Sequence, residues 1–219
     1  MTNIKNNIWC IIRPNVIDWK LINLGIMWTG FFISKNKFIT SYHLFNKNVF
    51  IDNSEYSNDY IILKNISWNE IYIKESDNIL YIKEKDLTII TLNNNYSFLK
   101  LENNYILNEN IENFGFPAYL INNLLEYNNW KINIKWISKQ EGKIMKLDNN
   151  FSINATDITI SSKKVIIMNY SSKIGFSWWP LFNNNLKVIG IMSLIVPISY
   201  GIYWNKALAI SSKEFVEYI

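Results

Sequence analysis

Cysteine, histidine, glycine and proline are all scarce in this 219-residue chain. The single cysteine, Cys10, has no second cysteine with which to form an intramolecular disulfide, and this favours a reducing compartment. Because there is also only one histidine, a zinc site built from His and Cys ligands is nearly excluded. We therefore expect a protein without a metal or a cofactor.

Charge is also sparse, since Asp, Glu, Lys and Arg make up 18% of the residues and the net charge is +4. The lysines are scattered and form no block of five or six like charges, so no nucleic-acid partner is expected. The N-terminal 20 residues lack the features of a secretory signal, and the most apolar run, 188–198, is too short to span a bilayer. We expect a cytoplasmic protein with no membrane partner.

Apolar residues are abundant, at 49%, and aromatic residues reach 16%. Such residues, together with β-branched ones, fit pleated and half-buried surfaces, and asparagine clusters at 93–95 and 183–185 suit turns. Short strand-like runs recur at the spacing of a sandwich or barrel. They begin near residues 8, 25, 48, 60, 70 and 87, and resume at 110, 131, 142, 158, 164, 186 and 201. The sequence therefore predicts an all-β fold.

The polar stretch 92–105 separates the two sets of runs and predicts a crossing between two halves, residues 1–104 and 105–219. Only the last nine residues have a helical pattern. Ser211 and Glu214 have capping-box spacing, and Phe215 and Ile219 lie on one helical face. We expect a short C-terminal helix.

Three segments stand out along the chain: WTGFFISKNKFITSYHLF at 28–45, KEKDLTIITL at 83–92 and KIGFSWWPLFNNNLKVIGIMS at 173–193. Together they resemble the chymotrypsin-like serine proteases, which carry T-[AS]-x-H, D-[LI]-[AT]-[LI] and G-x-S-G-G-P motifs in this order. His43 and Asp86 are 43 residues apart, and Asp86 and Ser177 are 91 apart. The corresponding gaps in the family are about 45 and about 93.

The resemblance implies two six-stranded antiparallel β-barrels with His43, Asp86 and Ser177 as a catalytic triad between them. A serine hydroxyl needs a base to accept its proton, and His43 is the only imidazole in the chain. The family's aspartate holds that imidazole in the correct tautomer, a role that falls to Asp86. By the same resemblance, the amides of Gly175 and Ser177 form the oxyanion hole.

The chain departs from the family at Trp178 and Trp179, which replace the two glycines that normally follow the nucleophile. Two indoles at this place either point outward or displace what packs there. Because Gly175 and Pro180 are retained on either side, we expect the turn to keep its shape and at least one indole to line the cleft. A degenerate, non-catalytic domain is the alternative that this departure leaves open.

Substrate specificity is indicated more weakly, again through the resemblance. The floor of the S1 pocket falls on Ser171 and its walls on Ser193, Leu194 and Ile195, with 200–202 opposite them. Since none of these is acidic, a neutral or apolar P1 side chain is expected, and Trp178 is a further candidate for substrate contact. The residue before Ser177 is Phe176 and not an aspartate, so maturation should need no N-terminal trimming.

Two functions of different classes follow from the sequence. The first is a serine endopeptidase that acts on a protein or peptide substrate, and the second is a peptide-recognition or protein-recognition module that uses the same cleft. A nucleic-acid-binding barrel is a distant third. A regulatory protein partner is compatible with either of the first two, and the oligomeric state is left open.

Overall fold

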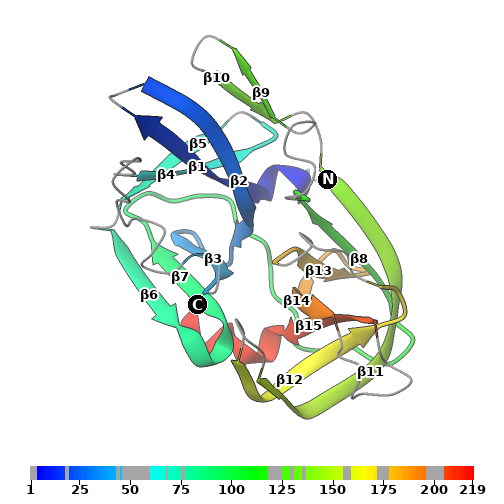
Figure 1. Cartoon of the computed structure of the whole chain (residues 1–219). Helices are drawn as coiled ribbons and strands as arrows, with labels where there is room; N and C mark the ends of the chain where they lie inside the picture. Colours follow the sequence, from blue (N-terminus) through cyan, green and yellow to red (C-terminus); the bar gives the residue numbers. More distant parts are fainter. Residues whose placement is uncertain are drawn as a thin grey trace.

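The computed structural model describes residues 4–17, 20–42, 45, 60–67, 69–74, 77–117, 125–128, 131–134, 137–154, 159–171, 178–195 and 205–219. Strands dominate these residues (Figure 1), and the helical turns among them are short 3-10 turns. None of those turns is long and apolar enough to cross a membrane.

The first half of the chain forms an antiparallel sheet of seven strands in the order β5-β4-β1-β2-β3-β7-β6. The strands are β1 (Ile8–Ile17), β2 (Lys20–Phe32), β3 (Lys37–Ser41), β4 (Tyr60–Asn65), β5 (Glu70–Lys74), β6 (Asn78–Ile82) and β7 (Leu87–Thr91).

Part of this sheet is buried on both faces, as the alternation along residues 8–12 of β1 shows. Trp9 and Ile11 pack into a core within the first half, together with Phe32 and Phe38. Their neighbours Ile8, Cys10 and Ile12 point the other way, into a second core shared with the other half of the chain. Successive side chains of a strand point to opposite faces, so a continuously apolar stretch such as 8–12 is stable only between two cores.

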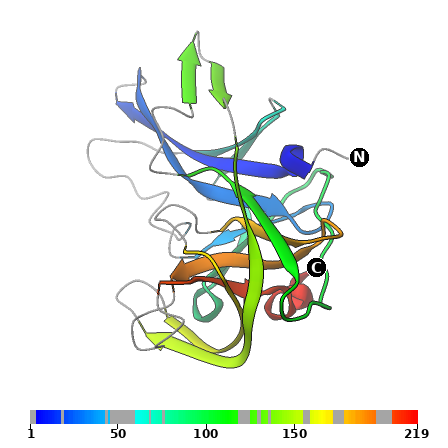
Figure 2. The ribbon, with the colours of Figure 1, turned by 90° about the vertical axis from the view of Figure 1, so that its right-hand side faces the viewer.

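The second half closes into a barrel of six strands in the order β11-β12-β15-β14-β13-β8. Its strands are β8 (Asn110–Gly115), β11 (Ser138–Asn154), β12 (Thr159–Met168), β13 (Pro180–Asn183), β14 (Val188–Ile195) and β15 (Ala207–Ser211). The remaining pair, β9 (Leu125–Asn128) and β10 (Lys131–Ile134), forms a separate hairpin that projects away from the barrel in both views (Figures 1 and 2).

The end of the chain returns to the first half (Figure 1). It forms two 3-10 turns, η6 (Ser212–Glu214) and η7 (Val216–Tyr218), and the Lys37 ammonium donates to the Tyr218 carbonyl oxygen over 2.6 Å. Phe215 is buried in the core that both halves share. The last residues therefore fasten the barrel to the sheet.

The expected all-β body is confirmed, and the second half is the closed six-stranded barrel that was expected. In the described part of the first half, seven strands form a curled sheet and not a closed barrel of six. The short strands β3, β6, β9 and β13 are not among the expected runs. The runs expected near residues 48 and 201 lie outside the described residues.

The expected C-terminal helix is present as two short 3-10 helices and not as one α-helix. Ser211 caps the first of them, and its side chain accepts the Lys213 amide at 3.1 Å. The other member of the expected capping box, Glu214, instead accepts the amide of Lys164 at 3.0 Å. Together with the burial of Phe215 in the shared core, this contact fixes the segment on the barrel.

Candidate active site

Asp86 lies at the corner between β6 and β7, directly after the 3-10 turn η3 (Lys83–Lys85). Its backbone is left-handed, with φ of 50° and ψ of 40°, and its amide donates to the Lys83 carbonyl oxygen at 3.0 Å. Aspartate is one of the few residues besides glycine that tolerate this conformation. The residue is only 2% exposed, so the corner holds a carboxyl group away from bulk water.

The register between β3 and β7 brings the chain just before position 43 against this corner. Ser41 pairs with Leu87, and the next amide, that of Tyr42, donates to the Asp86 carbonyl oxygen at 3.2 Å. His43 itself lies outside the described residues. Tyr42, the described residue next to His43, therefore contacts Asp86, the residue that the motifs pair with His43.

The far side of the same turn is also anchored. The Phe45 amide donates to the Ser41 carbonyl oxygen at 2.9 Å, and the Thr88 hydroxyl donates to the Phe45 carbonyl oxygen at 2.8 Å. Because Thr88 lies on β7 two residues after Asp86, both ends of the segment 41–45 are fastened to the strand that follows the carboxylate.

Gly175 and Ser177 lie outside the described residues, and the description resumes at Trp178. The Trp178 amide donates to the Met192 carbonyl oxygen at 2.6 Å, and the Met192 amide donates to the Trp179 carbonyl oxygen at 2.9 Å. Pro180 then begins β13 and pairs with Ile191 on β14. Proline suits the first position of a strand, where its missing N–H costs little. The chain that follows Ser177 is thus fixed to β14.

Trp178 has a left-handed backbone, with φ of 73°. This conformation favours glycine and strains a bulky side chain. The chymotrypsin-like proteases have glycine at this position, and glycine suits such a backbone. Here the same turn carries a tryptophan, which suits it poorly.

Both indoles are 0% exposed, and the two point in opposite directions. Trp178 packs in the core that the two halves share, and Trp179 packs inside the barrel. A Cβ atom on Gly115 would lie 2.1 Å from Cδ1 of Trp179, so the glycine of β8 makes room for the ring. The sequence predicts that at least one indole lines the cleft and that Trp178 contacts substrate, whereas neither ring presents surface to solvent in this structure.

The residues expected to form the S1 pocket have different surroundings. Ser171 is exposed, just beyond the end of β12, and Ser193 is buried on β14. Leu194 and Ile195 continue β14 and pair with Leu208 and Ala207 on β15. Their side chains and residues 200–202 lie outside the described parts of the chain, so the expected pocket stays a prediction.

A buried threonine, Thr29, joins the two halves beside the site, and the sequence analysis did not identify this role. The Phe116 amide of the second half donates to the Thr29 hydroxyl at 2.9 Å. The Thr40 hydroxyl donates to the Thr29 carbonyl oxygen at 3.3 Å. A hydroxyl within the apolar run 25–34 was the available signal, since a buried polar atom needs a partner.

Cys10, the other nucleophilic side chain that the sequence singled out, is unsuited to catalysis. It is fully buried in β1, and burial raises the pKa of its thiol far above the ordinary range. A thiol that is neutral and inaccessible is inert. Among the described residues, no group of three or more His, Cys, Asp or Glu side chains could hold a metal ion.

Solved structures resemble the whole chain, whereas no family model and no curated protein sequence matches it. The apo MamO protease domain from Magnetospirillum magneticum has a TM-score of 0.60 at 10% identity, over 100% of this chain and 98% of that one. The active form of the Rv3671c protease from M. tuberculosis gives 0.59 at 12% identity, over 96% and 78%.

A third neighbour, the HtrA-type protease AlgW with a tripeptide, has a TM-score of 0.63 at 14% identity. The match covers 97% of this chain but only 58% of AlgW. At such low identity the likeness shows the fold and no more. The chain has the chymotrypsin-like fold of trypsin-like protease domains, as its motifs led us to expect.

Proposed function

We propose that the chain is a serine endopeptidase that cleaves protein or peptide substrates through an acyl-enzyme. Ser177 attacks the scissile carbonyl carbon while His43 accepts its proton, and His43 then protonates the leaving amine. Asp86 orients the imidazole and stabilises its charged form, and the amides of Gly175 and Ser177 bind the oxyanion. Water then attacks the acyl-enzyme with the same assistance from His43, and the acid product leaves.

The observation that carries this proposal is the hydrogen bond from the Tyr42 amide to the Asp86 carbonyl oxygen, set by the β3–β7 register. It supports the pairing of a histidine at the next position with a carboxyl group held in a buried corner. The fold supports it further, because chymotrypsin-like domains carry their catalytic groups between the two halves.

Labelling with a fluorophosphonate probe tests the proposal directly. The wild type should react at Ser177, and Ser177→Ala and His43→Ala should not, since one lacks the hydroxyl and the other its base. Ser67→Ala, which removes an exposed serine of the first half, is the matched control and should react like the wild type. Robust labelling of a folded His43→Ala protein would contradict the triad.

Asp86→Asn is the most informative variant for the third residue. Asparagine tolerates the left-handed backbone at this corner and has nearly the same shape, so the fold should be kept. The labelling rate should nevertheless fall by roughly 10³–10⁴-fold, because the imidazole is no longer held in the productive tautomer.

The second candidate function is a recognition module without catalysis, and the strained backbone at Trp178 is the observation that favours it. Trp178 directly follows Ser177, whose amide is one of the two expected oxyanion donors. If the folded wild type does not react with the probe, this function replaces the first.

Cleavage, if found, should favour neutral or apolar P1 residues, because Ser171 provides no charge for Lys or Arg.

A further inference from the structure

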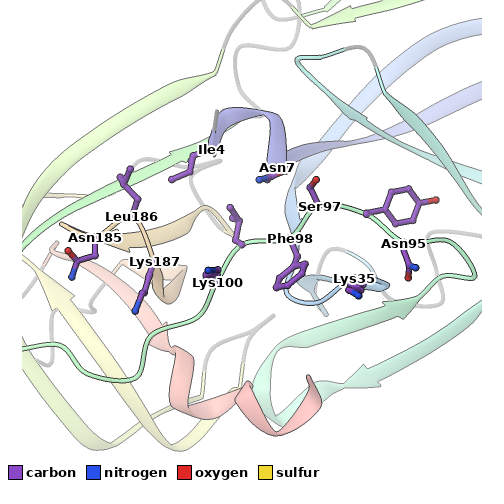
Figure 3. Close-up of a pocket in the computed structure, with 12 residues that line it drawn as sticks. Ile4, Asn7, Lys35, Asn95, Ser97, Phe98, Lys100, Asn185, Leu186 and Lys187 are labelled. Atoms are coloured by element: carbon purple, nitrogen blue, oxygen red, sulfur yellow. The ribbon is translucent and has the colours of Figure 1, made fainter. Parts of the chain in front are cut away.

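A groove of ≈900 Å³ lies where four segments of the chain meet (Figure 3). The N-terminal 3-10 helix η1 (Ile4–Asn7) contributes Ile4 and Asn7, and the other three segments form its walls. One wall is the β2–β3 turn with Lys35, the second is the connecting segment 95–100, and the third is the β13–β14 turn with Leu186 and Lys187. The groove thus straddles the seam between the sheet and the barrel.

Hydrogen bonds hold the connecting segment between the two halves. The Tyr96 amide donates to the Lys35 carbonyl oxygen at 2.6 Å, and the Val188 amide donates to the Lys100 carbonyl oxygen at 2.8 Å. In addition, the Tyr96 ring stacks on Phe32 with centroids 4.6 Å apart. This wall of the groove is therefore fixed before any ligand arrives.

The β13–β14 turn is fixed as well. The side-chain oxygen of Asn183 accepts the amides of Asn185 and Lys187, both at 3.1 Å. The Leu186 amide donates to the Asn183 carbonyl oxygen at 2.9 Å. This turn therefore presents Leu186 and Lys187 at defined places on the rim of the groove.

The groove is positively charged. Lys35, Lys100 and Lys187 line it, and no Asp or Glu is among its lining residues. Lys187 is paired with Glu102 at 2.9 Å, whereas within the described parts of the chain Lys35 and Lys100 have no ion pair. Two exposed ammonium groups thus face the same hollow without a counter-charge from the described residues.

The groove also exposes apolar surface and continues into a second hollow. Phe98 and Leu186 are each 40% exposed, and Phe98 lies between Lys35 and Lys100 (Figure 3). The neighbouring hollow of ≈490 Å³ shares Asn7 and the segment 95–97 with the groove. It is lined mainly by polar side chains, and its one carboxylate, that of Glu70, is paired with Lys64. Amide side chains can donate to and accept from a peptide backbone.

We propose that this groove binds an extended acidic peptide segment of a protein partner. Carboxylates of the peptide pair with Lys35 and Lys100, and an apolar side chain between them packs on Phe98 and Leu186. The continuation of the groove into the neighbouring hollow suits an extended chain better than a small anion. A few separated lysines suit scattered carboxylates better than the continuous phosphates of a nucleic acid.

The groove is separate from the candidate active site. β3 starts beside Lys35 and ends at Ser41, and β13 starts just after Trp178 and ends just before the β13–β14 turn. The four residue steps of β3 span about 13 Å at the usual rise of a strand. The proposed binding therefore does not depend on catalysis.

Fluorescence anisotropy tests it with a fluorescein-labelled peptide in which Glu alternates with Leu, and with a twin that has Gln in place of Glu. All proteins carry Ser177→Ala so that the probe is not cleaved. The Glu peptide should bind, the Gln twin should bind roughly tenfold more weakly, and raising ionic strength should weaken the Glu peptide alone.

The double variant Lys35→Gln/Lys100→Gln should weaken the Glu peptide by roughly tenfold. The matched control Lys74→Gln/Lys143→Gln removes the same charge from exposed positions outside the groove and should leave binding unchanged. Phe98→Ala should weaken the peptide several-fold, because it removes the apolar contact.

Three outcomes would overturn the proposal. The first is that the folded protein does not bind the Glu peptide, and the second is that both double variants lose affinity for it equally. The third is that a single-stranded oligonucleotide binds while the Glu peptide does not. None of these bears on the labelling of Ser177, so the two proposals fail or stand separately.

Discussion

Two corners of the molecule each contain a residue with positive φ, and the two residues are very different. Asp86 before β7 and Trp178 before β13 are both left-handed, with φ of 50° and 73°. Aspartate accepts this conformation readily, whereas a bulky aromatic residue in it is strained by about 1–3 kcal/mol. A turn of this kind can therefore be occupied by a residue that tolerates positive φ, as at Asp86. It can also be occupied by a residue that the surrounding packing holds in place, as at Trp178.

The contacts of the two corners explain the difference. The Asp86 corner is held by backbone pairing to Tyr42 and, at the surface, by Lys85, whose ammonium donates to the Glu214 carbonyl oxygen at 3.0 Å. The Trp178 turn is held by burial, because Trp178 and Trp179 place two complete indoles in two different cores. Packing of this size can outweigh a strained backbone.

The largest effect should come from removing the core support of the tryptophan turn. Trp179→Ala should lower the free energy of unfolding by about 3–5 kcal/mol, because it leaves a cavity inside the barrel. Urea unfolding measures this, and Tyr72→Ala, which truncates an exposed aromatic residue on β5, should change stability much less. A loss below about 1 kcal/mol for Trp179→Ala would show that the turn is not held by packing.

The next effect tests the fit between Trp179 and Gly115. Gly115→Ala should lower the free energy of unfolding by about 2–3 kcal/mol, because the new methyl group would overlap the indole. In a Trp179→Leu background the same change should be much milder, since the smaller side chain leaves room. Additive losses in the double-mutant cycle would contradict the proposed contact.

A smaller effect separates strain from packing at Trp178. Trp178→Gly and Trp178→Ala lose the same indole, but only glycine relieves the left-handed backbone, so the Gly variant should be more stable than the Ala variant by about 1 kcal/mol. At Trp9, a buried tryptophan of β1 without positive φ, the order should be reversed. Thermal or urea unfolding of the four variants measures both differences.

The smallest effect concerns the surface support of the Asp86 corner. Burial alone would lower the pKa of Lys85, but hydrogen bonds to Glu217 and Tyr218 raise it. A raised lysine pKa stabilises the fold below the ordinary value of about 10.4, and this contribution is lost as the pH rises through the folded-state pKa.

Lys85→Gln should therefore lower the free energy of unfolding by roughly 0.5 kcal/mol near neutral pH, and less at pH above the lysine pKa. Urea unfolding of the two proteins at neutral and at strongly alkaline pH measures the difference. A difference that stays constant over this range would mean that the charge of Lys85 does not support the corner.

Much of the architecture could be predicted from local pattern. The strand runs at 60–64, 70–74 and 87–91 are found where their residues alternate or are continuously apolar. β13 was missed because it begins with a proline and runs into the asparagine turn. β6 was missed although it is as long as β5 and β7, and it becomes a strand by pairing with β7. A local pattern does not report such a neighbour.

The candidate site divides in the same way. The motifs predict that Asp86 pairs with His43, and Tyr42, the described neighbour of position 43, does lie against the backbone of Asp86. The direction of the two indoles could not be predicted. It depends on Gly115, which is more than 60 residues away in the chain and adjacent only after the barrel has closed.

The sequence by itself determined the β-rich body, the order of its two halves and the spacing of the three motifs, because these follow from the periodicity of side chains and from residue types at fixed offsets. The tertiary structure alone decided which side chains the two halves share, how Thr29 and Phe116 join them, and where lysines from three separate segments come to line one groove. Those outcomes depend on contacts between residues far apart in the chain, and such contacts exist only once the strands have found their partners.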